Sequence, residues 1–174
     1  AAIGRDAWDT CAAPTGDPFV SYDFLDACEA SGSAVPSEGW AARHLSLHDG
    51  AVIGVMPLYL KGHSQGEYVF DHSWADAYQR AGGRYYPKLL GAVPFTPATG
   101  PRFLIRPSVT PESPQGLSGA AQYADVSALG GPGSTLRSGR DDAIRSALLQ
   151  GALTLTERLG VSSLHVNFPT ESDW

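Results

Sequence analysis

The sequence of 174 residues has few of the features that identify common protein classes. Its two cysteines, Cys11 and Cys28, form no CxxC pair and have no cluster of histidines nearby, so we expect idle or buried thiols and no metal site. No apolar run reaches the ~18 residues of a membrane span. No basic segment precedes a long apolar one, so no signal peptide is expected and a cytoplasmic location is predicted.

Basic residues are also scarce. The chain has 12 Lys and Arg against 18 Asp and Glu, a net charge of −6, which disfavours indiscriminate binding to nucleic acid or anionic membranes. The cations are unevenly distributed, because residues 61–106 hold 6 Lys and Arg against 3 acidic residues. Such a basic island indicates either a site for an anionic ligand or a solvated face.

At 43% hydrophobic residues, the chain has the composition of one folded α/β domain over residues 1–174. Residues 107–139 hold 4 Pro, 6 Gly and 6 Ser and predict a flexible loop. A strand, a long helix and a strand at the end of the chain predict a crossover in a mixed sheet. The expected elements are a helix beginning at Asp17-Pro18, strands at 44–48 and 51–60 joined by an Asp49-Gly50 turn, a strand at 67–71, a helix from Ser73 to Gly82, strands at 88–93 and 102–106, a helix from Asp141 to Gly160, and a strand at 163–168. The last helix would bury one apolar face, formed by Ile144, Leu148, Ala152, Leu155 and Leu159, and the last strand would turn Leu164, Val166 and Phe168 toward the core.

Residues 57–102 concentrate aromatic, charged and His side chains among glycines and prolines, a composition typical of a binding cleft. Glu67 and Asp71 are candidate catalytic carboxylates. If 67–71 is extended, they lie ~13 Å apart, too far for a glycosidase pair, so one of them would act alone as a base. Glu67 ranks first, because Asp71 also suits a turn or helix cap. His63 precedes Ser64, but GxSxG is absent and adjacency alone does not make a hydrolase.

The same segment holds candidate substrate-binding residues. Its cations could hold a carboxylate or phosphate, or lie on solvated surface. Its aromatic side chains predict core or cleft wall, and Trp74, Ala77, Tyr78 and Ala81 would form one apolar helix face. The residues selected for substrate binding are Lys61, Tyr68, Tyr85, Lys88 and Arg102.

Several strings of the sequence are unlike common motifs. The longest are KGHSQGEYVFD at 61–71 and SWADAY at 73–78, followed by YYPK at 85–88 and PFTP at 94–97. Together with DPF at 17–19 and SSLHV at 162–166, they resemble the bacterial FemAB-like family, which is labelled peptidoglycan biosynthesis/recognition and is grouped with the GNAT-type acyltransferases. The likeness extends over most of the chain outside residues 107–139.

The resemblance implies a GNAT-like α/β fold, with a mixed, largely antiparallel central sheet flanked by helices. It also implies that this chain is the N-terminal half of a two-half protein and packs against a C-terminal half or a second copy. The implied activity is N-acyl transfer to an amine, with a small molecule or a cell-wall precursor as acceptor. The donor would be an acyl-CoA or an aminoacyl-tRNA. In that activity Glu67 would be the general base, assisted by His63 or Asp71.

The chain departs from the GNAT pattern at one place. GNAT enzymes hold the CoA pyrophosphate on a Gly-rich turn at a helix N-terminus, and here the equivalent helix is expected to begin near Arg140 with two carboxylates, Asp141 and Asp142. Those carboxylates would repel a pyrophosphate. A non-catalytic recognition module and a purely structural half are therefore alternative hypotheses.

Overall fold

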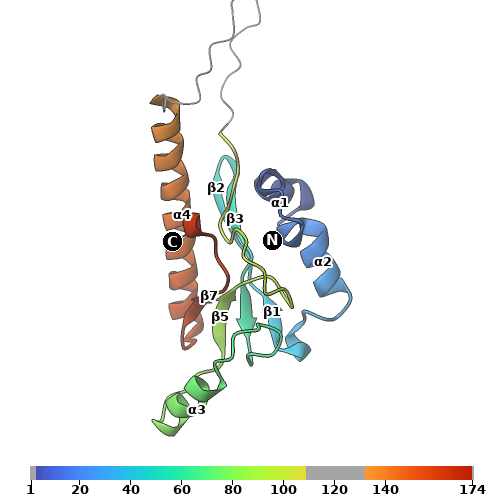
Figure 1. Ribbon diagram of the computed structural model, residues 1–174, viewed down its shortest axis with the longest axis vertical. Coiled ribbons are helices and arrows are strands. Elements are labelled where there is room, and N and C mark those ends of the chain that lie inside the picture. Colours follow the sequence, from blue (N-terminus) through green and yellow to red (C-terminus); the bar gives the residue numbers. More distant parts are fainter. Residues whose placement is uncertain (1–2, 109–131, 174) are drawn as a thin grey trace, which may run out of the picture.

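Two sheets form the framework of residues 3–108 and 132–173, the part of the chain that the computed structural model describes (Figure 1). The first sheet has the order β1-β4-β5-β7 and is antiparallel except for the parallel pair β5 and β7. The second has the order β2-β3-β6 and is antiparallel. The strands are β1 Trp40–Ala42, β2 Leu45–Asp49, β3 Ala51–Met56, β4 Tyr59–Lys61, β5 Lys88–Gly91, β6 Leu104–Ile105 and β7 Leu164–Val166.

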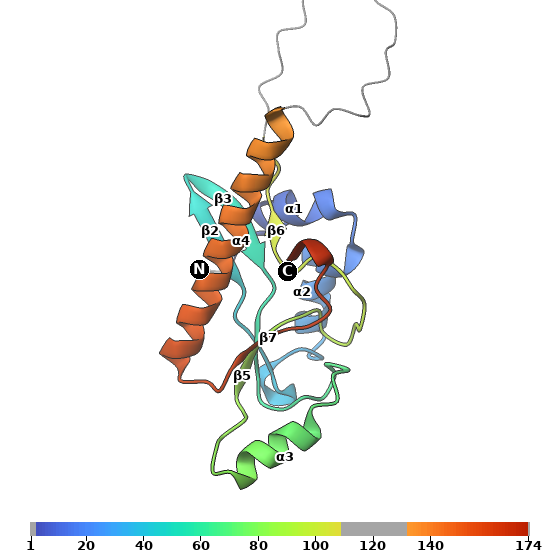
Figure 2. The ribbon, with the colours of Figure 1, turned by 60° about the vertical axis from the view of Figure 1, so that its left-hand side comes forward.

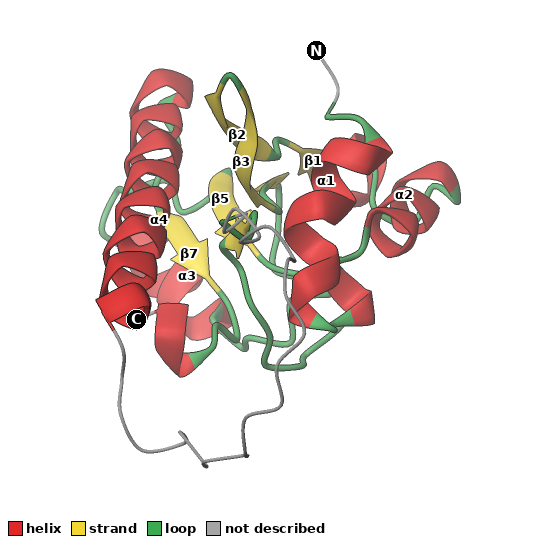
Figure 3. Cartoon of the chain, turned by 90° about the horizontal axis from the view of Figure 1, so that it is seen from above, coloured by secondary structure: helices red, strands yellow, loops and turns green. Residues whose placement is uncertain are grey.

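Four α-helices accompany these strands in the described residues, which confirms an α/β fold with largely antiparallel strands. Two sheets are present where the sequence predicts a single central one. In Figure 3, α4 lies on one side of the strands, and α1 and α2 lie on the other. The helices are α1 Arg5–Ala12, α2 Tyr22–Ala30, α3 His72–Arg80 and α4 Pro132–Leu159.

The hairpin of β2 and β3 confirms the clearest local prediction. Asp49 pairs with Ala51 around Gly50, whose φ of +68° is the backbone conformation that a tight Asp-Gly turn requires. The predicted continuation of the second strand to residue 60 is wrong, because β3 ends at Met56 and β4 belongs to the other sheet.

The predicted crossover is present between β5 and β7, but the strand directly before α4, β6, belongs to the second sheet. β5 and β7 pair in parallel, with Leu90 opposite His165, and α4 precedes β7 along the chain (Figure 2). Helix α4 turns the face that carries Ile144 and Leu148 toward the strands, where both side chains are buried. The apolar periodicity thus identified the core face at these positions, whereas Leu159, at the end of the predicted face, is 41% exposed.

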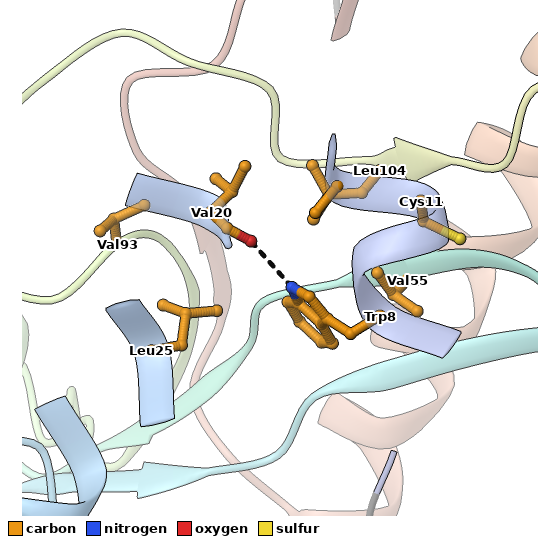
Figure 4. Packing of buried hydrophobic residues seen from close by; sticks show 8 residues of the cluster. Trp8, Cys11, Val20, Leu25, Val55, Val93 and Leu104 are labelled. Carbon is orange, nitrogen blue, oxygen red and sulfur yellow. Dashed lines mark hydrogen bonds between the residues drawn. The ribbon is translucent and has the colours of Figure 1, made fainter. Parts of the chain in front are cut away.

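A separate core lies between the N-terminal helices and β3. Trp8 is buried there against Val55, and its indole Nε1 donates a 2.8 Å hydrogen bond to the carbonyl of Val20 (Figure 4). The helix predicted to begin at Asp17 begins later, because Asp17 caps only the 3-10 turn Pro18–Val20 and Ser21 caps α2.

Two further predictions need correction. Residues 67–71 form no strand, because Tyr68 adopts a φ of +56° that interrupts any extended run. Residues 109–131 of the predicted loop lie outside the described residues, whereas residues 132–139 belong to α4. Asp141 and Asp142 therefore lie inside a helix that begins at Pro132, and the repulsion expected from carboxylates at its N-terminus does not apply.

Candidate functional site

The buried ammonium of Lys88 contacts several polar side chains of the segment 57–102. Lys88 lies at the start of β5 with no exposed surface. Its Nζ is 2.9 Å from Glu67 Oε2 and 2.7 Å from Asp71 Oδ2, and it donates a 3.0 Å hydrogen bond to Ser64 Oγ. We call these four residues the Lys88 cluster. Both candidate carboxylates thus contact one nitrogen, and the ~13 Å separation expected for an extended segment is wrong.

The loop between β4 and α3 creates this geometry. Gly66 has a φ of +78°, and a Cβ there would lie 2.6 Å from the Phe95 ring. Only glycine fits both the backbone and the space. The turn at Gly66 and the positive φ of Tyr68 direct Glu67 and Asp71 toward β5 instead of to opposite faces of a strand.

Two tyrosines complete the cluster from the β5 side. Tyr85 donates a 2.7 Å hydrogen bond from its hydroxyl to Asp71 Oδ2, and the Tyr86 hydroxyl is 2.6 Å from Ser64 Oγ. The Lys88 Nζ lies 5.3 Å and 5.6 Å from the centroids of these two rings, within cation–π range.

The two carboxylates have opposite electrostatic environments. Burial raises the pKa of Glu67, and the charges of Lys88 and Lys61 offset only part of that increase. Burial also acts to raise the pKa of Asp71, but hydrogen bonds with Lys88, Ser64 and Tyr85 outweigh it and lower the pKa to about 2. Glu67 Oε1 and Asp71 Oδ1 are buried without a hydrogen-bond partner in the described structure.

Lys61 occupies a second buried position beside the cluster. Its Nζ lies 3.4 Å from the centroid of the Trp40 ring and donates a 3.1 Å hydrogen bond to the carbonyl of Gln65. Burial lowers the pKa of Lys61 to about 8, and attraction from Glu67 only partly opposes that decrease.

The remaining predicted residues are not brought into the Lys88 cluster. His63 Nδ1 accepts from the Gln65 amide, and its ring packs where a Cβ on Gly39 would lie. Arg102 is 1% exposed and donates to the carbonyls of Asn167 and Ala98. Tyr68 is half exposed. The buried cations of the basic island thus form internal contacts and are not a solvated face.

Asp71 connects the cluster to a pocket of about 380 Å³. Trp74, Tyr78, Tyr85 and His165 are among the residues that line it. Trp74 and Tyr78 had been expected in the core or a cleft wall, and the cleft wall is what the structure shows.

Sequence reasoning missed His165. The parallel pairing of β7 with β5 places this residue at the pocket, while the alternation of Leu164 and Val166 had indicated only that it points away from the core. His165 Nε2 is 2.9 Å from Ser163 Oγ, and burial together with the Lys88 charge lowers the pKa of the imidazole. At neutral pH this side chain is therefore uncharged.

A larger pocket, of about 430 Å³, lies between the N-terminal helices and the strands, and Glu29 and His44 are among its lining residues. Glu29 Oε1 already accepts hydrogen bonds from His44 Nε2 at 2.9 Å and from the Tyr59 hydroxyl at 3.2 Å. The Lys88 cluster is the stronger candidate, because it contains buried carboxylate oxygens without partners and two groups with opposite pKa shifts.

Comparison with known proteins agrees with the sequence motifs. The profile of the FemAB-like family, described as peptidoglycan biosynthesis/recognition, matches residues 1–132, which include the whole 61–88 segment. No curated protein and no solved structure matches the chain. None of the helices within the described ranges is long and apolar enough to span a bilayer. The chain belongs to the FemAB-like family of peptidoglycan biosynthesis and recognition.

Proposed function

We propose that this chain takes part in acyl or aminoacyl transfer to an amine of a peptidoglycan precursor, with Glu67 as the proton acceptor. The observation that supports the proposal is the divergence of the two carboxylates at Lys88. Asp71 is held ionised, whereas Glu67 has a pKa raised by burial. Neighbouring carboxyl groups whose environments separate their pKa values are typical of acid–base sites.

The transfer requires such a proton acceptor. An amine attacks the donor carbonyl, a C–N bond forms, and the bond from carbon to the thiol or ribose oxygen of the donor breaks. The attacking nitrogen gives up one proton during this step, and a carboxylate with a raised pKa accepts it more readily than an ordinary one.

Glu67 has no exposed side-chain surface, so the proton must reach it through neighbours. The contacts provide a continuous path: Glu67 and Asp71 both contact the Lys88 ammonium, and Tyr85 donates to Asp71. Asp71 and Tyr85 line the pocket of about 380 Å³. In this proposal Glu67 acts through these contacts, and Asp71 and Tyr85 are the groups nearest the ligand.

The test is the isosteric Glu67→Gln variant in the full-length protein. We expect transfer from acyl-CoA or aminoacyl-tRNA to a precursor amine, measured by mass spectrometry, to fall by at least ~100-fold, the usual contribution of a general base. Glu157→Gln makes the same chemical change on an exposed part of α4 and should keep full activity. Transfer at the wild-type rate by a folded Glu67→Gln protein would contradict the role.

A non-catalytic recognition module is the second candidate function. The complete burial of Lys61 and Lys88 favours it, because a buried ion cluster can stabilise the fold without taking part in a reaction. Binding of a precursor by the full-length protein, without turnover in the presence of either donor, would support this alternative.

A further inference from the structure

Helix α3 presents an aromatic face that no core covers. Trp74 is 75% exposed and Tyr78 is 49% exposed, one turn apart on the same side of the helix. In Figures 1 and 2, α3 extends from the end of the first sheet, away from the other helices. Large aromatic side chains that contribute only to the core are buried. Aromatic side chains that stay exposed next to a pocket are typical of a ligand site.

The aromatic face continues around the pocket that Asp71 lines. The Tyr78 and Tyr85 rings meet edge to face at 6.3 Å between centroids, and Tyr85 meets the His165 ring at 6.0 Å. Together with Trp74, these rings form most of a wall around a space of about 380 Å³. Aromatic rings carry negative charge on their faces, which attracts a cation.

Asp71 gives the pocket lining a negative formal charge. Asp71 is only 7% exposed, and its Oδ1 is buried without a hydrogen-bond partner in the described part of the chain, so this carboxylate keeps an unsatisfied acceptor. No Lys or Arg is among the described residues that line the pocket, and His165 is uncharged at neutral pH. The ammonium of Lys88 is fully buried and already contacts Asp71 Oδ2.

Three hydroxyl groups of the lining are engaged within the protein: the Tyr85 hydroxyl donates to Asp71, the Ser162 hydroxyl donates to the Tyr85 carbonyl, and Ser163 Oγ pairs with His165 Nε2. The carboxylate of Asp71 and the aromatic faces favour a ligand that brings donors and positive charge. A primary ammonium has three donors and no acceptor, and it binds to aromatic faces.

We propose that the pocket formed by Asp71, Trp74, Tyr78, Tyr85 and His165 binds a primary ammonium group carried on an aliphatic chain. The apolar part of the chain would lie against the rings, and the ammonium would approach the carboxylate. If the transferase function proposed above holds, this ligand is the acceptor amine of the peptidoglycan precursor, bound in its protonated state. Only this identification of the precursor rests on the proposed function.

The test uses two small probes and needs no acyl donor. Nα-acetyl-lysine methylamide carries one ammonium group, and Nα,Nε-diacetyl-lysine methylamide has the same chain without the charge. We expect the first to shift the Trp74 indole N–H resonance in a ¹H–¹⁵N spectrum in a saturable way, and the second to bind at least about tenfold more weakly.

Variants separate the aromatic contribution from general surface effects. Trp74→Ala should weaken binding of the charged probe by about 2- to 30-fold, the range expected for one cation–π contact, with the Tyr85 resonances as reporter. Because Trp74 is 75% exposed, this variant should fold normally. Phe70→Ala is the matched control, since Phe70 is 83% exposed and does not line the pocket.

Equal binding of the two probes, which would indicate an apolar or sugar-binding pocket, overturns the proposal. So does the absence of saturable binding by the charged probe, or binding that Trp74→Ala leaves unchanged. The transferase function is tested separately, by the transfer assay. Probe binding without any transfer by the full-length protein would refute the transferase and keep the ammonium site, whereas transfer without probe binding would do the reverse.

Discussion

Replacing Lys88 with methionine should destabilise the protein strongly. The Lys88→Met variant keeps most of the side-chain volume but removes the one ammonium that contacts both Glu67 and Asp71, at 2.9 Å and 2.7 Å. Removing one partner of a buried ion pair costs about 3–5 kcal/mol, because the other partner is left as an uncompensated buried charge. Since a domain has about 5–15 kcal/mol of unfolding free energy, the variant would be folded but marginal.

The assay is urea denaturation at several pH values, followed by far-UV circular dichroism. In the wild type the pKa of Asp71 is lowered from 3.8 to about 2, so its contribution to stability is present above pH ~3.8 and is lost as the pH falls toward 2. In the variant both carboxyl groups should have raised pKa values, so stability should decrease as the pH rises from 4 to 7. The penalty of Lys88→Met should therefore be smaller at pH 4 than at pH 7.

Two comparisons make the result specific. Arg158→Met removes an exposed cation from the end of α4 and should change the unfolding free energy by no more than about 0.5 kcal/mol. Adding Glu67→Gln and Asp71→Asn to Lys88→Met removes the uncompensated charges and should recover part of the loss. A penalty below about 1 kcal/mol for Lys88→Met at pH 7, or a penalty independent of pH, would refute the reasoning about charge burial.

Two further predictions concern other buried positions. The pKa of Lys61 is lowered from 10.5 to about 8, so its charged form costs stability below pH 8. Lys61→Met should therefore raise the unfolding free energy by up to about 3 kcal/mol at pH 6 and by less at pH 10. An effect of the same size at both pH values would contradict this prediction. Gly54→Ala would place a Cβ 2.7 Å from Ile144 Cγ2 and should lower the unfolding free energy by about 1–3 kcal/mol. Gly151→Ala is its control: the nearest atom to a Cβ there is 3.6 Å away, so the helix should gain up to about 1 kcal/mol, and equal losses for both variants would contradict the packing argument.

Local patterns in the sequence determined the elements that depend on neighbours in the chain. The Asp49-Gly50 pair between alternating residues predicted the hairpin, because turn geometry and strand periodicity are both short-range properties. The spacing of Ile144 and Leu148 predicted the buried face of α4 for the same reason. The motif at 61–71 indicated the family and selected the segment that holds the candidate site.

The site itself was decided by tertiary structure. Glu67 and Asp71 were expected on a strand and far apart, but the turn at Gly66 directs both toward Lys88, a residue on another strand. His165 reaches the pocket only because β7 pairs in parallel with β5, which lies more than 70 residues earlier. The Trp74 and Tyr78 face could not be assigned to core or cleft, because periodicity shows which side chains share a face and not what that face meets. Such long-range contacts leave no local pattern, so the sequence selected the participating segment, and the packing of distant strands decided how its side chains meet.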